Sequence, residues 1–179
     1  MRDLGRSTLS IKSVVPVIKE NDTFRRMKTL VFEQYLPITL DEAWEFFSSP
    51  SNLNLITPDR LHFNTLSEVP KHIYEGLMIR YRIKPMMNVP IIWVTKITSI
   101  KDKEYFVDEQ IKGPYKIWRH DHRFKEADGG VLVTDTLGYE IGFGILGKLA
   151  GMLWVDRQVR EIFSYRSEKL KSIFNRKND

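Results

Sequence analysis

The chain has 179 residues, and its 28 Lys or Arg residues against 23 Asp or Glu residues give a formal net charge of +5 at pH 7. This length favours one domain with a sizeable hydrophobic core. The composition, 42% hydrophobic and 28% charged, is ordinary for a globular protein. Cysteine is absent, which excludes disulfides, thiol catalysis and Cys-ligated zinc or iron–sulfur centres.

The positive charge is not gathered into one basic stretch. Residues 1–26 carry six basic and three acidic groups, so this segment contributes +3 and leaves +2 for residues 27–179. Basic and acidic residues alternate through the remainder, which is typical of a solvated surface rather than a nucleic-acid face. We therefore expect no nucleic-acid partner. No apolar run approaches the roughly 20 residues of a spanning helix, so we also expect no stable membrane insertion.

The first 26 residues differ from the rest of the chain. Lys12 and Lys19 interrupt their apolar residues, so they lack the unbroken apolar stretch of an export signal. We expect residues 1–26 to be a disordered N-terminal extension, and residues 27–179 to form a single domain. The expected location is cytoplasmic.

The predicted elements begin with a strand over 29–36, which is rich in β-branched and aromatic residues and ends before Pro37. Thr39 or Asp41 then caps a helix whose apolar side includes Phe47. A second short helix is predicted over 51–56. A helix pair this short does not suit a parallel βαβ arrangement.

Six further strands follow, separated by turn residues and joined by short connections, which makes successive strands antiparallel. They are predicted over 60–66, 77–84, 91–100, 105–112, 115–124 and 131–141. The chain closes with a long helix over 146–174, whose buried stripe consists of Leu146, Leu149, Leu153, Val159, Ile162, Phe163, Leu170 and Ile173.

These elements predict an α+β fold. A curved antiparallel sheet of seven strands has one apolar face, and a single long amphipathic helix is its natural cover. The sheet therefore wraps around the C-terminal helix, and the two short helices between the first and second strands close one end.

Side-chain alternation indicates which residues face the helix. If Gly113-Pro114 is the tip of a hairpin, Glu109 lies opposite Trp118, and Val107 lies opposite His120. This register puts Glu109 on the inner face with His120 and His122. It also makes Asp108 and Arg119 an exposed ion pair.

Alternation in the next strand turns Asp135 inward, beside the histidines, so the apolar wall carries a cluster of Glu109, His120, His122 and Asp135. Three interpretations of this cluster stand. It is a self-satisfied polar network that fixes strand register, or it orients a bound small molecule. The third interpretation is catalysis or a metal site on His120 and His122, since two imidazoles and a carboxylate suit zinc or non-haem iron.

Several motifs resemble one known family. They are Phe47…Pro50…Asn52-Leu53…Ile56-Thr57-Pro58, then Phe106-Val107-Asp108-Glu109-Gln110, then Gly113-Pro114-Tyr115…Trp118…His120…His122-Arg123-Phe124, and Asp135. With the element order, this pattern resembles the START-like, or SRPBCC, ligand-binding superfamily. It is similar to a subgroup of small bacterial CHU_1110-like SRPBCC proteins. The resemblance implies a helix-grip fold with a deep hydrophobic cavity between sheet and helix, but no single chemistry.

The first functional hypothesis is therefore binding of a hydrophobic small molecule, lipid-, polyketide- or isoprenoid-like, without a cofactor and without covalent chemistry. Its expected contacts are Tyr81, Trp93, Glu109, Trp118, His120, His122, Asp135, Tyr139 and Leu153. The alternative is an enzyme of cyclase or dehydratase type, without a nucleotide cofactor, in which a His–carboxylate pair moves protons. Its catalytic candidates are His120, His122, Glu109 and Asp135. A third hypothesis is an interaction module in which Trp44, Trp93 and Trp154 fill the core.

Overall fold

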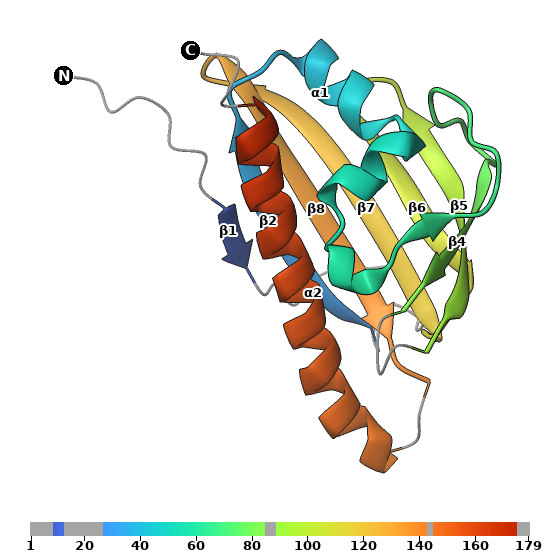
Figure 1. The fold of residues 1–179 in the computed structure, drawn as a ribbon. Helices are drawn as coiled ribbons and strands as arrows, with labels where there is room; N and C mark the ends of the chain where they lie inside the picture. Colours follow the sequence, from blue (N-terminus) through green and yellow to red (C-terminus); the bar gives the residue numbers. More distant parts are fainter. Residues whose placement is uncertain (1–8, 13–26, 85–88, 143–144, 175–179) are drawn as a thin grey trace.

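One antiparallel sheet curves around a long C-terminal helix (Figure 1). The computed structural model describes residues 9–12, 27–84, 89–142 and 145–174, and side chains within 27–84, 89–142 and 154–174. The elements in chain order are β1 (Leu9–Lys12), β2 (Lys28–Leu36), α1 (Leu40–Phe47), the 3-10 helices η2 (Pro50–Ile56) and η3 (Asp59–Leu61), β3 (Asn64–Thr65), β4 (Met78–Ile83), β5 (Ile91–Lys101), β6 (Tyr105–Lys112), β7 (Ile117–Ala127), β8 (Gly130–Glu140) and α2 (Ile145–Phe174).

The sheet order is β1-β2-β8-β7-β6-β5-β4-β3, so the seven predicted strands are present and one strand is added at the edge. The added strand is β1, which pairs antiparallel with β2 from Leu9↔Gln34 to Lys12↔Val31. These four residues fall within the segment expected to be a disordered extension, and they pair with the edge of β2. The other residues before Met27 lie outside the described part of the chain.

The strand predicted over 60–66 is much shorter than expected. Asp59–Leu61 form the 3-10 turn η3, and His62 follows with a left-handed backbone (φ 45°), which interrupts an extended chain. Only Asn64–Thr65 remain as β3.

Helix α1 begins with a capping box. The Thr39 hydroxyl accepts a hydrogen bond from the Glu42 amide at 3.2 Å, and the Glu42 carboxylate accepts one from the Thr39 amide at 3.0 Å. The helix so fixed lays Trp44 edge-on against Phe124, with ring centroids 5.6 Å apart. This contact closes one end of the sheet, as predicted for the short helices.

Helix α2 is held on the sheet mainly through β2 and β8. The rings of Phe32 and Phe163 stack in parallel with centroids 3.8 Å apart, and Leu30, Leu137 and Val159 are buried around them. A second buried cluster joins α1, β4 and β5 to the last turns of α2. Predicted stripe residues Leu146, Leu149 and Leu153 fall where side chains are not described. Among the described helices, none has the length and apolar character to cross a membrane.

Candidate functional site

The β6–β7 hairpin pairs one residue away from the predicted register. Asp108 lies opposite His120, and Glu109 lies opposite Arg119. Because side chains alternate along a strand, a slip of one residue exchanges the two faces. Asp108 therefore joins His120 and His122 on the inner face, and the predicted place of Glu109 in the cluster is wrong.

The turn explains the slip. The last pair of the ladder is Glu109↔Arg119, so residues 110–118 join the two strands and Gly113-Pro114 is not a two-residue tip. Instead, the Gln110 side chain closes a longer turn: its Nε2 donates to the Tyr115 carbonyl at 2.6 Å, and its Oε1 accepts from the Tyr115 amide at 3.4 Å.

The outward-turned Glu109 has a different partner. Its carboxylate lies 2.5 Å from Arg119 Nη1, and both side chains are 35% exposed. The predicted exposed pair between Asp108 and Arg119 is therefore wrong as well. The ion pair belongs to Glu109, on the side of the sheet away from the cluster.

The β7–β8 hairpin brings Asp135 to the histidines, as predicted. Asp128 (φ 41°) and Gly129 (φ 79°) form its two-residue turn, and both positive angles fit type I′ geometry. The register that follows places His122 opposite Asp135. A turn formed by Asp-Gly thus fixes the position of a buried carboxylate.

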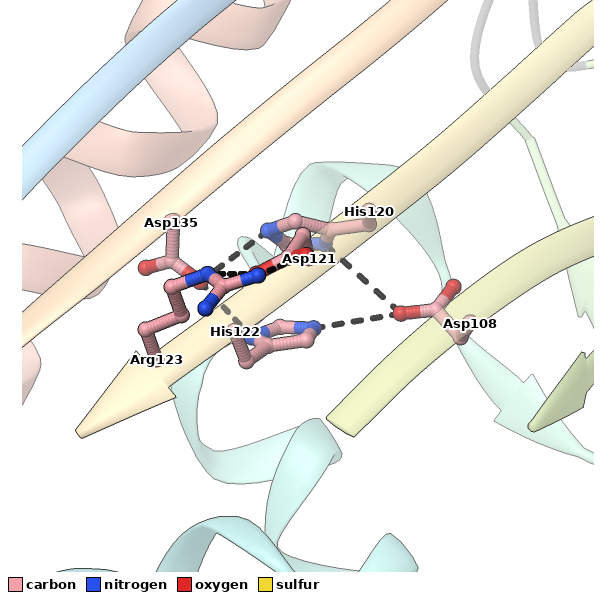
Figure 2. A network of polar contacts seen from close by, with 6 residues as sticks. All are labelled: Asp108, His120, Asp121, His122, Arg123 and Asp135. Carbon is pink, nitrogen blue, oxygen red and sulfur yellow. Dashed lines mark hydrogen bonds and ion pairs between the residues drawn. The ribbon is translucent and has the colours of Figure 1, made fainter. Parts of the chain in front are cut away.

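Two carboxylates enclose two adjacent imidazoles, whose planes are tilted by 40° (Figure 2). Asp135 Oδ1 lies 3.0 Å from His120 Nε2 and 2.7 Å from His122 Nδ1. On the other side, Asp108 Oδ2 lies 3.1 Å from His122 Nε2 and 3.8 Å from His120 Nδ1. The imidazole centroids are 3.7 Å apart, and both histidines and Asp135 are buried. We call these four residues the Asp–His network.

The neighbouring side chains in Figure 2 belong to the other face of β7. Asp121 and Arg123 alternate with His120 and His122 along the strand, and Arg123 Nε lies 2.9 Å from Asp121 Oδ1. Their ion pair is separate from the Asp–His network.

The network distributes its protons unequally. Burial alone would lower the pKa of His122, but the attraction of Asp135 and the hydrogen bond to Asp108 raise it to about 9. Burial and the adjacent His122 lower the pKa of His120. Burial alone would raise the pKa of Asp135, but His122 and His120 hold it well below its ordinary value. At neutral pH, His122 is an imidazolium, His120 is neutral and Asp135 is a carboxylate.

A cavity of about 220 Å³ borders this network. Five of the predicted ligand contacts line it: Tyr81, Trp93, Trp118, His120 and His122. Most of the remaining wall is aliphatic or aromatic, from β4, β5, the short helices and α2. The cavity therefore has an apolar body and a charged side.

The other predicted contacts lie elsewhere. Glu109 is on the opposite face of the sheet, and Asp135 lies behind the histidines rather than on the cavity wall. Tyr139 is 1% exposed and donates its hydroxyl proton to Asp156, which also pairs with Lys28. Leu153 falls outside the described side chains.

Aromatic side chains form one wall of the cavity. The indoles of Trp93 and Trp118 meet edge-on with centroids 5.0 Å apart, and Tyr115 lies 4.6 Å from Trp118. Burial raises the pKa of Tyr115 to about 12, and burial together with Asp108 also raises the pKa of Tyr81. Both phenols are therefore neutral at physiological pH.

Asp108 and Arg166 line the cavity but were missed by the sequence interpretation. Arg166 is 9% exposed, and its guanidinium lies 4.9 Å from the centroid of the Phe163 ring. A signal for it existed in the sequence. Arg166 comes three residues after Phe163 and four before Leu170, so helical spacing puts it on the buried stripe.

The network also has the donors of a cation site. One ligand atom from each of Asp108, His120 and His122 lies within 4.8 Å of the others. Two imidazoles and a carboxylate suit zinc or iron, and Asp135 would orient both histidines from behind. A metal ion would have to displace the proton that His122 holds between two carboxylates.

Comparisons with known proteins identify the fold. Neither the protein-family models nor the curated proteins include a match to this sequence. Among solved structures, protein Ms6760 from Mycobacterium smegmatis is similar with a TM-score of 0.60 and 15% identity, over 83% of this chain and 92% of that one. The protein TTHA0849 from Thermus thermophilus has a TM-score of 0.58 and 19% identity, over 81% of this chain and 98% of that one. Major latex-like protein 151 from Panax ginseng has a TM-score of 0.60 and 13% identity, over 83% of this chain and 97% of that one.

These likenesses agree with the element order and the position of α2. The chain has the START-like, helix-grip fold that its sequence pattern predicts. Identities below one fifth show the fold, and the function must be argued from the site.

Proposed function

We propose that this protein binds a small hydrophobic molecule with a polar end in the cavity between sheet and α2, without covalent chemistry. The observation that carries the proposal is the composition of the cavity. Apolar side chains line most of it, and the Asp–His network lies at one side. Ligand sites commonly combine an apolar wall with a few convergent polar groups.

The size of the cavity narrows the class of ligand. At about 220 Å³ it is smaller than the roughly 300–1,000 Å³ of most drug-sized sites. A cavity of this size suits a ligand with one alkyl chain or a small ring system, of lipid, polyketide or isoprenoid type, rather than a lipid with two acyl chains. Burying about 200 Å² of apolar ligand surface would contribute roughly 5 kcal/mol before the costs of association.

Filling the cavity tests this proposal. Ile162 lines the cavity from α2 and is only partly buried, so Ile162→Trp places a larger side chain there at modest cost to folding. Ile111→Trp is the matched control, because Ile111 is 55% exposed and lies outside the cavity. Nile red, a neutral dye whose fluorescence rises in apolar sites, is the probe.

We expect Nile red to bind the wild type and Ile111→Trp equally, and we expect the same of decan-1-ol, a smaller neutral molecule that competes with the dye. Ile162→Trp should bind at least tenfold more weakly while keeping its circular dichroism spectrum and melting temperature. Equal binding by a folded Ile162→Trp would show that the probe lies outside the cavity, which contradicts the proposal.

A second function, proton transfer of cyclase or dehydratase type, is favoured by one observation. His120 lines the cavity as a neutral imidazole whose Nε2 contacts Asp135 at 3.0 Å, which is the arrangement of a general acid or base. His120→Ala separates the two functions. A binding protein should retain most of its affinity for decan-1-ol, whereas an enzyme should lose conversion of its co-purified ligand by orders of magnitude.

A further inference from the structure

Arg166 is a buried cation whose donors are not used by the described part of the chain. It is 9% exposed, lines the cavity, and makes no hydrogen bond or ion pair with any residue that the structure describes. Its Nε is fully buried without an acceptor. Its guanidinium lies over the face of the Phe163 ring. A buried charge left in this state is costly unless something pairs with it.

The nearby carboxylates do not fill that role. Asp135 and Asp108 are close enough to oppose the lowering of the Arg166 pKa by burial, but neither forms an ion pair with it. Both are already engaged by His120 and His122. The guanidinium therefore presents unused donors beside the cavity.

Its position on α2 is set by packing. Val159, Phe163 and Leu170 are buried on the same side of the helix, which holds Arg166 against the cavity rather than in solvent. The guanidinium is supported on the Phe163 ring, which also stacks on Phe32 and meets the His120 ring edge-on. An arginine supported in this way is suited to bidentate recognition of a planar anion.

We propose that Arg166 binds the carboxylate of an amphipathic monocarboxylic acid whose apolar part fills the cavity. This inference rests on the proposed function and specifies its ligand class. The apolar part would lie along the wall formed by Trp93, Tyr115 and Trp118, and the carboxylate would accept two parallel N–H bonds from the guanidinium.

Charge balance favours a monoanion over a phosphate monoester. The Asp–His network contains two carboxylates and one imidazolium, so Arg166 brings the local total to zero at neutral pH. One further carboxylate adds a single negative charge, directly paired with the guanidinium. A dianionic phosphate would add two, beside Asp108 and Asp135, with the same single partner.

The test compares alkyl chains that differ only at the head group. Hexanoate to dodecanoate, the alcohols of the same lengths and decyl phosphate are titrated at pH 7 into the full chain. Isothermal calorimetry measures binding, and a change in tryptophan fluorescence, to which Trp93 and Trp118 on the cavity wall contribute, reports a ligand in the cavity. Arg166→Met removes the charge, Arg166→Lys keeps it without the planar fork, and Arg157→Met is the matched control on the exposed side of α2.

For the wild type and Arg157→Met, we expect the best carboxylate to bind at least tenfold more tightly than its alcohol and than decyl phosphate. Arg166→Met should lose that preference, with a fall of about 100-fold for the acid and under threefold for the alcohol. The affinity of Arg166→Lys for the acid should lie between those of the wild type and Arg166→Met. This variant remains informative if Arg166→Met fails to fold.

Equal binding of acids and alcohols by the wild type would overturn the role of Arg166 but leave the proposed function intact. A preference that survives in Arg166→Met would also overturn it. If neither the acids nor the alcohols bind the wild type, the proposed function fails together with this inference.

Discussion

Replacement of Asp135 by asparagine should destabilise the fold in a way that depends on pH. Asp135 is buried and contacts both His120 and His122, so the substituted amide keeps the shape but removes the charge. The consequence reaches His122, whose pKa is held at about 9 instead of its ordinary 6.5. That difference corresponds to roughly 3 kcal/mol of interaction with the protonated imidazole.

The sign follows from proton linkage. Because the pKa of His122 is raised on folding, its contribution is fully present below pH 6.5 and disappears as the pH rises through 9. His120, with its pKa lowered, opposes folding as the pH falls below 6.5, since it protonates in the unfolded chain. The window from pH 7 to 9.5 therefore lies above the range in which His120 contributes, and His122 makes the larger change there because the buried tyrosines begin to oppose folding only near its upper end. Over this window the wild type should lose roughly 2 kcal/mol of unfolding free energy through this group.

Urea denaturation followed by tryptophan fluorescence measures these free energies. At pH 7 we expect Asp135→Asn to lower the unfolding free energy by roughly 3 kcal/mol, and to lose most of the slope between pH 7 and 9.5. Asp102→Asn, in an exposed turn, is the control and should change neither quantity. A wild-type-like slope in Asp135→Asn would refute the argument that this carboxylate holds the proton on His122.

Four further predictions concern the fold and the corrected register. Phe163→Ala removes the ring stacked on Phe32 and should cost about 3–5 kcal/mol of unfolding free energy, measured in urea. Thr39→Ala removes the capping box and should cost about 1 kcal/mol, whereas Thr39→Ser should cost much less. Glu109→Gln should change stability by less than about 1 kcal/mol, because its pair with Arg119 is partly exposed. Asp108→Asn should instead lower the pKa of His122 in an NMR titration. If Glu109→Gln lowered the pKa of His122 and Asp108→Asn did not, the register predicted from the sequence would be the correct one.

The sequence was sufficient for the fold because its signals were local. Alternation placed His120 and His122 inward on β7, and Asp128-Gly129 is a strong turn signal that fixed Asp135 beside them. The helical stripe from Val159 to Leu170 correctly placed the inner face of α2. Each of these features depends on residues that are near one another in the chain.

The cluster was predicted less well, because it depends on one turn. Whether Glu109 or Asp108 faces the histidines depends on how residues 110–118 connect the two strands. The Gln110 side chain closes that turn, and the alternation pattern does not show this contact.

Arg166 illustrates a different limit. Its place in the stripe follows from helical spacing, but a long arginine side chain can extend its head group to solvent from such a position. Packing around Phe163 decides that it stays inside. The existence of a cavity is likewise a property of packing rather than of residue pattern.

Native mass spectrometry shows whether the cavity holds one small amphipathic molecule. The protein is purified from its own cells and measured beside a denatured control, before and after addition of decanoate. We expect a single organic molecule bound to each chain, which is lost on denaturation and is displaced by decanoate in the wild type but far less readily in Arg166→Met. A mass equal to the bare chain in every sample, with decanoate present or not, would contradict it.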